Sequence, residues 1–211
     1  MRALPLFLLA MSLFVAAGAH ADVVVVDATG TVVFNGIANP PLNGVTVGET
    51  AVVSFEVDSN NFVDGIPGDT RGYVIDQPSF SLAFSGGVSV GLLSPFPAGQ
   101  TPYFTLVEGF PVSDGFFVST SNVSPGGVPI SQTPIQFNLD LGYIGSTLTS
   151  LDILDAQGTY DFTGLTRFAF NLWQIAPDNV VLDIEFASLT IQARPTATDA
   201  SSWGKVKALF R

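Results

Sequence analysis

The chain has 211 residues, a formal net charge of −11 and no cysteine. The lack of cysteine excludes disulfides and a cysteine-linked lipid anchor. The acidic balance argues against nucleic acid as a partner, because negative charge repels the phosphate backbone.

The first 21 residues, 1–21, have the pattern of a secretory signal peptide. Arg2 precedes an apolar run over 4–17, and small residues follow up to Ala21. We therefore predict cleavage between Ala21 and Asp22. The apolar run is shorter than the roughly 20 residues that a membrane-spanning helix needs, and no later stretch approaches that length. The mature chain is thus expected to have no transmembrane span and to be extracellular or on the cell surface, with the periplasm as the alternative.

Loss of this segment would also remove His20, the only histidine. The mature chain would then have no imidazole to activate a serine nucleophile. Residues 22–193 hold 17 carboxylates against two arginines, a net charge of −15, whereas residues 194–211 carry +3. The body and the C-terminal end therefore have opposite charge.

Residues 22–193 are predicted to form one all-β domain. Apolar and polar residues alternate in several segments, and turns rich in Gly and Pro separate them. Many short strands without helices between them favour an antiparallel β-sandwich of the Greek-key or jelly-roll type. The expected strands are 23–35, 50–58, 71–76, 79–85, 88–93, 103–108, 115–121, 135–142, 151–155, 159–163, 166–174 and 180–193.

The alternation also predicts which side chains face the core. In the last strand the apolar phase changes between Phe186 and Leu189, which indicates a β-bulge near Ala187 and Ser188. The expected core residues are Phe55, Phe80, Leu82, Phe84, Phe137, Leu139, Phe168, Phe170, Ile184 and Phe186.

Several segments of the domain carry a family resemblance. They are Val45–Asp58, with its Val-Gly-Glu-Thr turn before a strand, Tyr73, the strand Ser79–Gly87, and the later pieces Leu151–Leu154 and Tyr160–Phe162. In these the chain resembles secreted bacterial β-sandwich proteins that often carry PEP-CTERM sorting tails. The resemblance implies an exported surface or matrix protein. The chain departs from that pattern at its C-terminal end, which has neither Pro-Glu-Pro nor an apolar span.

The polar segment 58–69 is the candidate metal site. Oxygen-bearing side chains occupy positions 1, 3, 7 and 12 of a calcium-loop template: Asp58, Asn60, Asp64 and Asp69. Phe62 replaces a ligand of that template, and Val63 replaces its glycine. The alternative is an ordinary polar loop in which Asp and Asn favour turns. Calcium is the one cofactor that the sequence suggests.

A second candidate site is built on aromatic side chains. Trp173 falls on the polar side of its strand beside Arg167 and Asn171, and Tyr73 lies near the end of another strand. A planar aromatic side chain with polar neighbours suits a sugar ring. These residues are therefore the candidate ligand site of a carbohydrate-binding module. The alternative is that Trp173 packs beneath a loop.

Carboxylates are the only side chains left for acid–base catalysis. Glu56 and Glu185 lie on polar faces of expected strands, and Glu108 ends another. A retaining glycosidase needs two carboxyl groups about 5 Å apart. The simpler interpretation is that these side chains belong to solvated strand faces.

The C-terminal end divides into a polar linker, 194–202, and a short amphipathic tail, 203–211. In a helical conformation the tail would separate apolar from basic side chains, as segments that dock on a membrane surface do. A sorting or docking role is therefore predicted, and a frayed terminus is the alternative. The residues concerned are Trp203, Lys205, Val206, Lys207, Leu209, Phe210 and Arg211.

These features predict an exported, non-enzymatic β-sandwich protein with a surface or extracellular-matrix role. A carbohydrate-binding module is the first alternative, and a carboxylate-based glycosidase is the second. The expected partners are a glycan, or a cell-surface or sorting partner that binds the tail.

Overall fold

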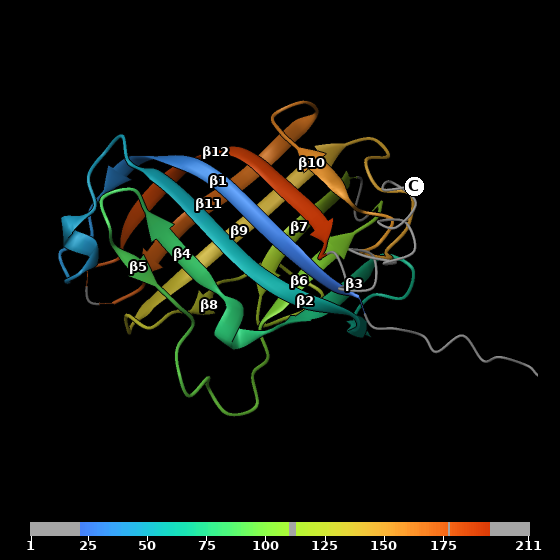
Figure 1. The fold of residues 1–211 in the computed structure, drawn as a ribbon, viewed down its shortest axis with the longest axis horizontal. Coiled ribbons are helices and arrows are strands. Elements are labelled where there is room, and N and C mark those ends of the chain that lie inside the picture. Colours follow the sequence, from blue (N-terminus) through green and yellow to red (C-terminus); the bar gives the residue numbers. More distant parts are fainter. Residues whose placement is uncertain (1–21, 110–112, 177, 195–211) are drawn as a thin grey trace, which may run out of the picture.

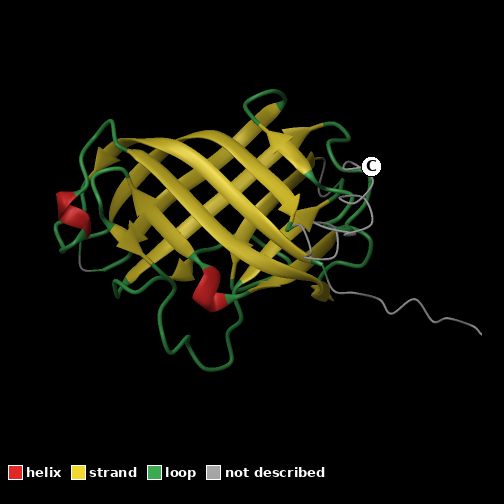
Figure 2. Ribbon diagram, viewed as in Figure 1, coloured by secondary structure: helices red, strands yellow, loops and turns green. Residues whose placement is uncertain are grey.

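The computed structural model describes residues 22–109, 113–176 and 178–194, and nearly all of them lie in strands or in the loops between strands (Figure 2). The expected signal peptide and the tail 203–211 lie outside these residues. Within the described part, two short 3-10 segments are the only helical elements, Leu42–Gly44 (η1) and Gln77–Ser79 (η2). No helix there is long and apolar enough to cross a membrane.

The strands are labelled in chain order in Figure 1. They are β1 (Val23–Asn35), β2 (Thr50–Asp64), β3 (Thr70–Ile75), β4 (Ser81–Phe84), β5 (Ser89–Val90), β6 (Tyr103–Val107), β7 (Ser113–Ser119), β8 (Val128–Pro129), β9 (Ile135–Ile144), β10 (Gly158–Tyr160), β11 (Leu165–Gln174) and β12 (Val180–Ala193).

Eight of these strands form one closed antiparallel sheet, a barrel. Their order is β1-β12-β11-β9-β7-β6-β3-β2, and β2 pairs with β1 to close the ring. In Figure 1 the strands β1, β2 and β12 cross over β9 and β11, so two walls of the same sheet enclose the core. The predicted all-β, antiparallel architecture is confirmed. The two separate sheets of a sandwich are not confirmed, because the hydrogen-bonded ladder is continuous around the ring.

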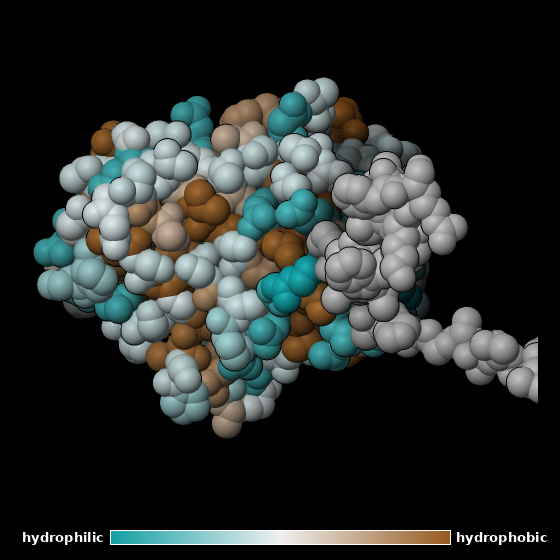
Figure 3. Space-filling model, in the orientation of Figure 1, coloured by the Kyte–Doolittle hydropathy of each residue, from teal (hydrophilic) through white to brown (hydrophobic). Residues whose placement is uncertain are grey.

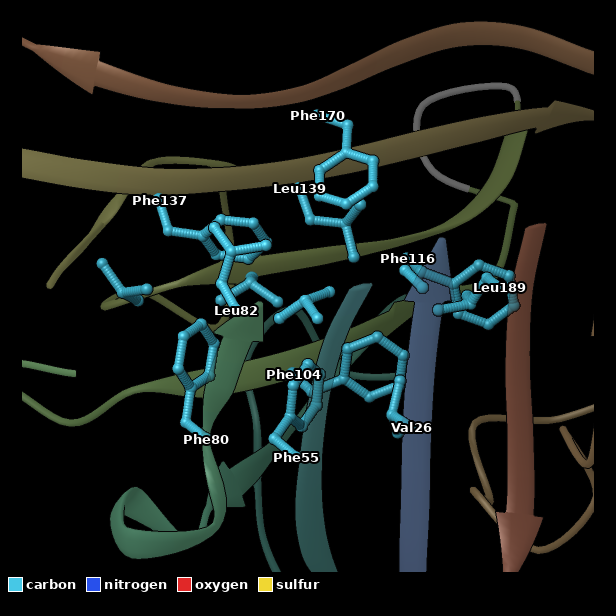
Figure 4. Packing of buried hydrophobic residues seen from close by; sticks show 14 of the residues in the cluster. Val26, Phe55, Phe80, Leu82, Phe104, Phe116, Phe137, Leu139, Phe170 and Leu189 are labelled. Carbon is cyan, nitrogen blue, oxygen red and sulfur yellow. The ribbon is translucent and has the colours of Figure 1, made fainter. Parts of the chain in front are cut away.

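Aromatic side chains fill the space between the two walls (Figure 4). Phe55 stacks on Phe80 with ring centroids 5.9 Å apart, and Phe80 meets Phe137 edge-on at 5.5 Å. Phe137 in turn contacts Phe170 at 6.0 Å. This chain of rings joins β2, on one wall, to β9 and β11 on the other, so the core holds the two walls together.

Nine of the ten predicted core residues are buried, and the exception is Phe168, which is 45% exposed. Phe168 has the same strand phase as the buried Phe170. It is exposed because β11 pairs with β12 only over Asn171–Gln174, so that the sheet is open beside the first part of β11.

The bulge predicted in the last strand is confirmed. Thr29 of β1 pairs with Ser188, and the next residue, Gly30, pairs with Phe186, which leaves Ala187 as the extra residue of β12. The bulge resets the alternation, so Phe186 and Leu189 both point into the core.

Other differences concern strand bounds. The segment 151–155 is a series of turns rather than a strand, although its apolar residues Leu151 and Ile153 are buried. Strand β2 continues to Asp64 instead of ending at Asp58. The two-residue strand β8 was not predicted, because so short a ladder leaves no period in the sequence.

The turns over 151–155 are fixed to the barrel by a buried tyrosine. The Tyr73 hydroxyl donates a hydrogen bond to the Leu151 carbonyl oxygen at 2.8 Å and accepts one from the Ile153 amide at 2.9 Å. Both backbone groups are therefore satisfied away from water. Tyr73 is fully buried, so its role is structural.

Buried tyrosines predict that the protein loses stability in alkali. Burial, with a smaller contribution from the nearby Asp161 charge, raises the pKa of Tyr143 to about 12, and burial also raises the pKa values of Tyr73 and Tyr160. A tyrosine whose folded pKa lies above its unfolded value of about 10 stabilises the fold below pH 10, and this stabilisation is lost as pH rises towards 12.

Urea denaturation between pH 9 and 12 should show this loss. The Tyr143→Phe variant should show a smaller loss than the parent. If Tyr143→Phe loses as much unfolding free energy between pH 9 and 12 as the parent does, the prediction is contradicted.

Candidate binding face

The outer side of β9 and β11 carries a row of polar side chains that we call the β11 face. Inward positions on these strands are apolar and buried, so the alternate positions point away from the core. The face brings together three of the four predicted ligand residues with polar residues of β9 and of the β11–β12 turn. Its members are Asn138, Asp140, Arg167, Asn171, Trp173 and Asn179.

Side chains of the face are bonded to one another across the strands. The Arg167 guanidinium forms a two-point ion pair with Asp140, with both N–O distances 3.0 Å. Asn138 Nδ2 donates to Asn171 Oδ1 at 2.9 Å. An exposed ion pair such as that between Arg167 and Asp140 adds little to stability, about 0–1 kcal/mol. These bonds restrict the positions of the donors and acceptors on the face.

Trp173 ends the row and is the only tryptophan among the described residues. Its side chain is 37% exposed, and its indole Nε1 donates to Asn179 Oδ1 at 2.8 Å. Asn179 has a φ of 49°, in the left-handed region that asparagine tolerates better than most residues. The turn therefore holds the indole by its nitrogen while part of the ring remains in contact with solvent.

Beside this face the sheet opens into a groove of about 390 Å³, the β11–β12 groove. It forms because β12 pairs with β11 only as far as Asp183 and next pairs on that side with β10, starting at Leu189. Its lining combines apolar with acidic side chains: Val33, Phe168, Ala169, Phe170, Asn171, Asp183, Ile184 and Glu185.

One predicted ligand residue does not belong to this site. Tyr73 is fully buried and bonded to Leu151 and Ile153, so it cannot stack on a ligand at the surface. Sequence reasoning also missed Asn138, Asp140 and Asn179. The polar phase of the strand 135–142 placed the first two on an outer face, but no local signal indicated that this strand lies next to β11.

The predicted calcium-binding loop is not formed as a loop. Asp58, Asn60 and Asp64 lie within β2, and the Asp64 carboxylate is bonded to Arg71 at 2.6 Å. Asp58 accepts a hydrogen bond from the Asn60 amide at 2.8 Å, and Asp69 lies in the turn before β3. Within the described ranges, no group of three or more His, Cys, Asp or Glu side chains is placed to hold a metal ion.

The two carboxylates considered for the glycosidase alternative, Glu56 and Glu185, lie far apart. Glu56 is opposite Val25 of β1, whereas Glu185 is opposite Thr31, six residues further along the same strand. At about 3.3 Å per residue this is a separation of about 20 Å, well beyond the roughly 5–9.5 Å between the carboxyl groups of glycosidases. Glu56 is also paired with Arg194.

Space-filling Figure 3 shows polar and apolar side chains interspersed on one side of the barrel. The predicted docking residues of the tail, from Trp203 to Arg211, lie outside the described residues. No known protein-family model, curated protein or solved structure matches this chain.

Proposed function

We propose that this protein is an exported, non-enzymatic surface or extracellular-matrix protein whose β11 face binds carbohydrate. The observation that carries the proposal is the partly exposed Trp173, held by its indole nitrogen at the end of a row of bonded amide and charged side chains. An aromatic ring can cover the apolar side of a sugar, and fixed amides can bind its hydroxyl groups.

The shape of the face also favours an extended ligand. Arg167 and Trp173 are six residues apart on β11, which corresponds to about 20 Å along the strand. Such a row can contact several units of a chain, while the β11–β12 groove beside it can take one ring. The distance between Glu56 and Glu185 favours binding over glycoside hydrolysis.

Replacing Trp173 by alanine is expected to weaken glycan binding at least tenfold, because a tryptophan contact in an interface often contributes more than 1.4 kcal/mol. The purified full chain would first be screened on a glycan array. The affinity of each bound glycan for parent and variant would then be measured by calorimetry.

Phe62→Ala is the matched control, because Phe62 is an aromatic residue of nearly equal exposure, 38%, on the distant strand β2. It should leave glycan affinity unchanged. A full array without binding, or equal losses in both variants, would contradict the proposal. The denaturation midpoint of each variant shows whether a loss of glycan affinity results from unfolding.

The proposed surface location depends on segments outside the described residues. The pattern of 1–21 supports export. The basic and apolar composition of 203–211 supports docking at a membrane surface or a sorting partner. Arg194, the first residue of the expected linker, is still bonded to the barrel, because its amide donates to the Val23 carbonyl oxygen at 2.7 Å.

A further inference from the structure

We propose that the β11–β12 groove selects amino sugars that carry a free ammonium group, and that glucosamine polymers are the preferred glycans of this protein. This inference rests on the proposed function, and it assigns the chemical class of the ligand. It follows from the charges around the groove and from the shape of its lining.

The first argument is that the basic side chains in the described part of the chain are already ion-paired. Arginines 71, 167 and 194 are the only Lys, Arg or His residues in the described part of the chain, and each is ion-paired with a carboxylate: Asp64, Asp140 and Glu56 respectively. The same part holds 17 carboxylates, of which 14 take no part in these ion pairs. An anionic sugar therefore meets no unpaired cation on the described surface, whereas a cationic sugar is attracted.

The second argument is the position of two of those carboxylates. Asp183 and Glu185 line the groove at alternate positions of β12, about 7 Å apart along the strand, and point to the same side of the sheet. Neither takes part in an ion pair with another described residue. They can thus neutralise an ammonium group without first giving up a partner.

The third argument is the apolar part of the groove lining. The ring of Phe168 and the methyl groups of Val33 are about half exposed, and they offer an apolar surface for one face of a sugar ring. Asn171 adds an amide on the side of the β11 face. Phe168 also makes an edge-to-face contact with Phe162, with ring centroids 6.0 Å apart and planes at 89°. The groove therefore combines a contact surface for the ring with a charge for its amine.

The test compares two oligosaccharides that differ in one group. Tetramers of β-1,4-linked glucosamine and of N-acetylglucosamine have the same backbone, but only the first carries ammonium groups. At low salt and mildly acidic pH, the full chain should bind the glucosamine tetramer about fivefold more tightly, as expected for one exposed ion pair. High salt should remove this preference, because ions screen exposed charges.

The double variant Asp183→Asn/Glu185→Gln should lose the preference while still binding the N-acetylated tetramer. The control Asp27→Asn/Glu108→Gln removes two charges elsewhere and should retain it. Equal affinity for both tetramers would overturn the inference and leave the proposed function intact. A preference that survives in the first double variant would show that the amine binds elsewhere on the acidic body, which also overturns it. Failure of the protein to bind any glycan would overturn both proposals.

Discussion

Replacing Phe137 by alanine is expected to lower the free energy of unfolding by about 3–5 kcal/mol. Phe137 is fully buried on β9. Its ring meets Phe80 on one side at 5.5 Å and Phe170 on the other at 6.0 Å. Truncation would leave a cavity between the two walls of the barrel, and the neighbouring rings cannot collapse into it without losing their own contacts.

Such a loss is a large part of the 5–15 kcal/mol that typically separates folded from unfolded states. Urea denaturation followed by tryptophan fluorescence measures it. Phe62→Ala is the control, because this ring is 38% exposed and lies outside the core cluster. It should cost less than half as much. A loss below about 1.5 kcal/mol for Phe137→Ala would show that the aromatic chain does not hold the walls together.

Local alternation was sufficient to predict most of the strands and the inward side chains. Phe55, Leu82 and Leu139 are buried because each occupies the apolar phase of its strand, and that phase is visible in a window of a few residues. The bulge at Ala187 was predictable for the same reason, since an extra residue interrupts the phase within a single strand.

Closure of the sheet was not predictable in this way. It depends on which strands pair, and β1 meets both β2 and the distant β12. The candidate face was not predictable for the same reason, because it also depends on which strands pair. Asn138 and Asn171 are far apart in the chain and meet because β9 and β11 are neighbours. The burial of Tyr73 was missed for the same reason, because its hydroxyl is bonded to Leu151 and Ile153, which lie 78 and 80 residues further along the chain.

The calcium template likewise takes no account of strand pairing. It counts positions along the chain, whereas the conformation of 58–64 is set by pairing with other strands. Asp58 is opposite Val23 of β1, and Asp64 is opposite Arg71 of β3. Their carboxylates therefore follow an extended strand instead of converging on one point.

Gly115→Ala is expected to be as damaging as the loss of a core ring, at about 3 kcal/mol or more. Gly115 of β7 pairs with Gly142 of β9, and a Cβ atom at position 115 would overlap the Leu141 carbonyl oxygen. That oxygen belongs to the backbone of the neighbouring strand, so no side-chain rotation can relieve the overlap. The two strands would have to separate, which weakens their hydrogen-bonded ladder and displaces Asp140 of the β11 face.

The glycine directly opposite provides the matched control. A Cβ atom at Gly142 would lie 3.5 Å from the guanidinium carbon of Arg167, an ordinary contact with a flexible side chain. Gly142→Ala should therefore change the free energy of unfolding by no more than about 1 kcal/mol. The two variants make the same chemical change on either side of one β-ladder pair, so equal denaturation midpoints would contradict the prediction. A large difference would show that close approach of β7 to β9 is what requires Gly115. Because a shift of β9 would move Asp140, the glycan affinity of Gly115→Ala then measures whether the ion pair between Arg167 and Asp140 is disturbed.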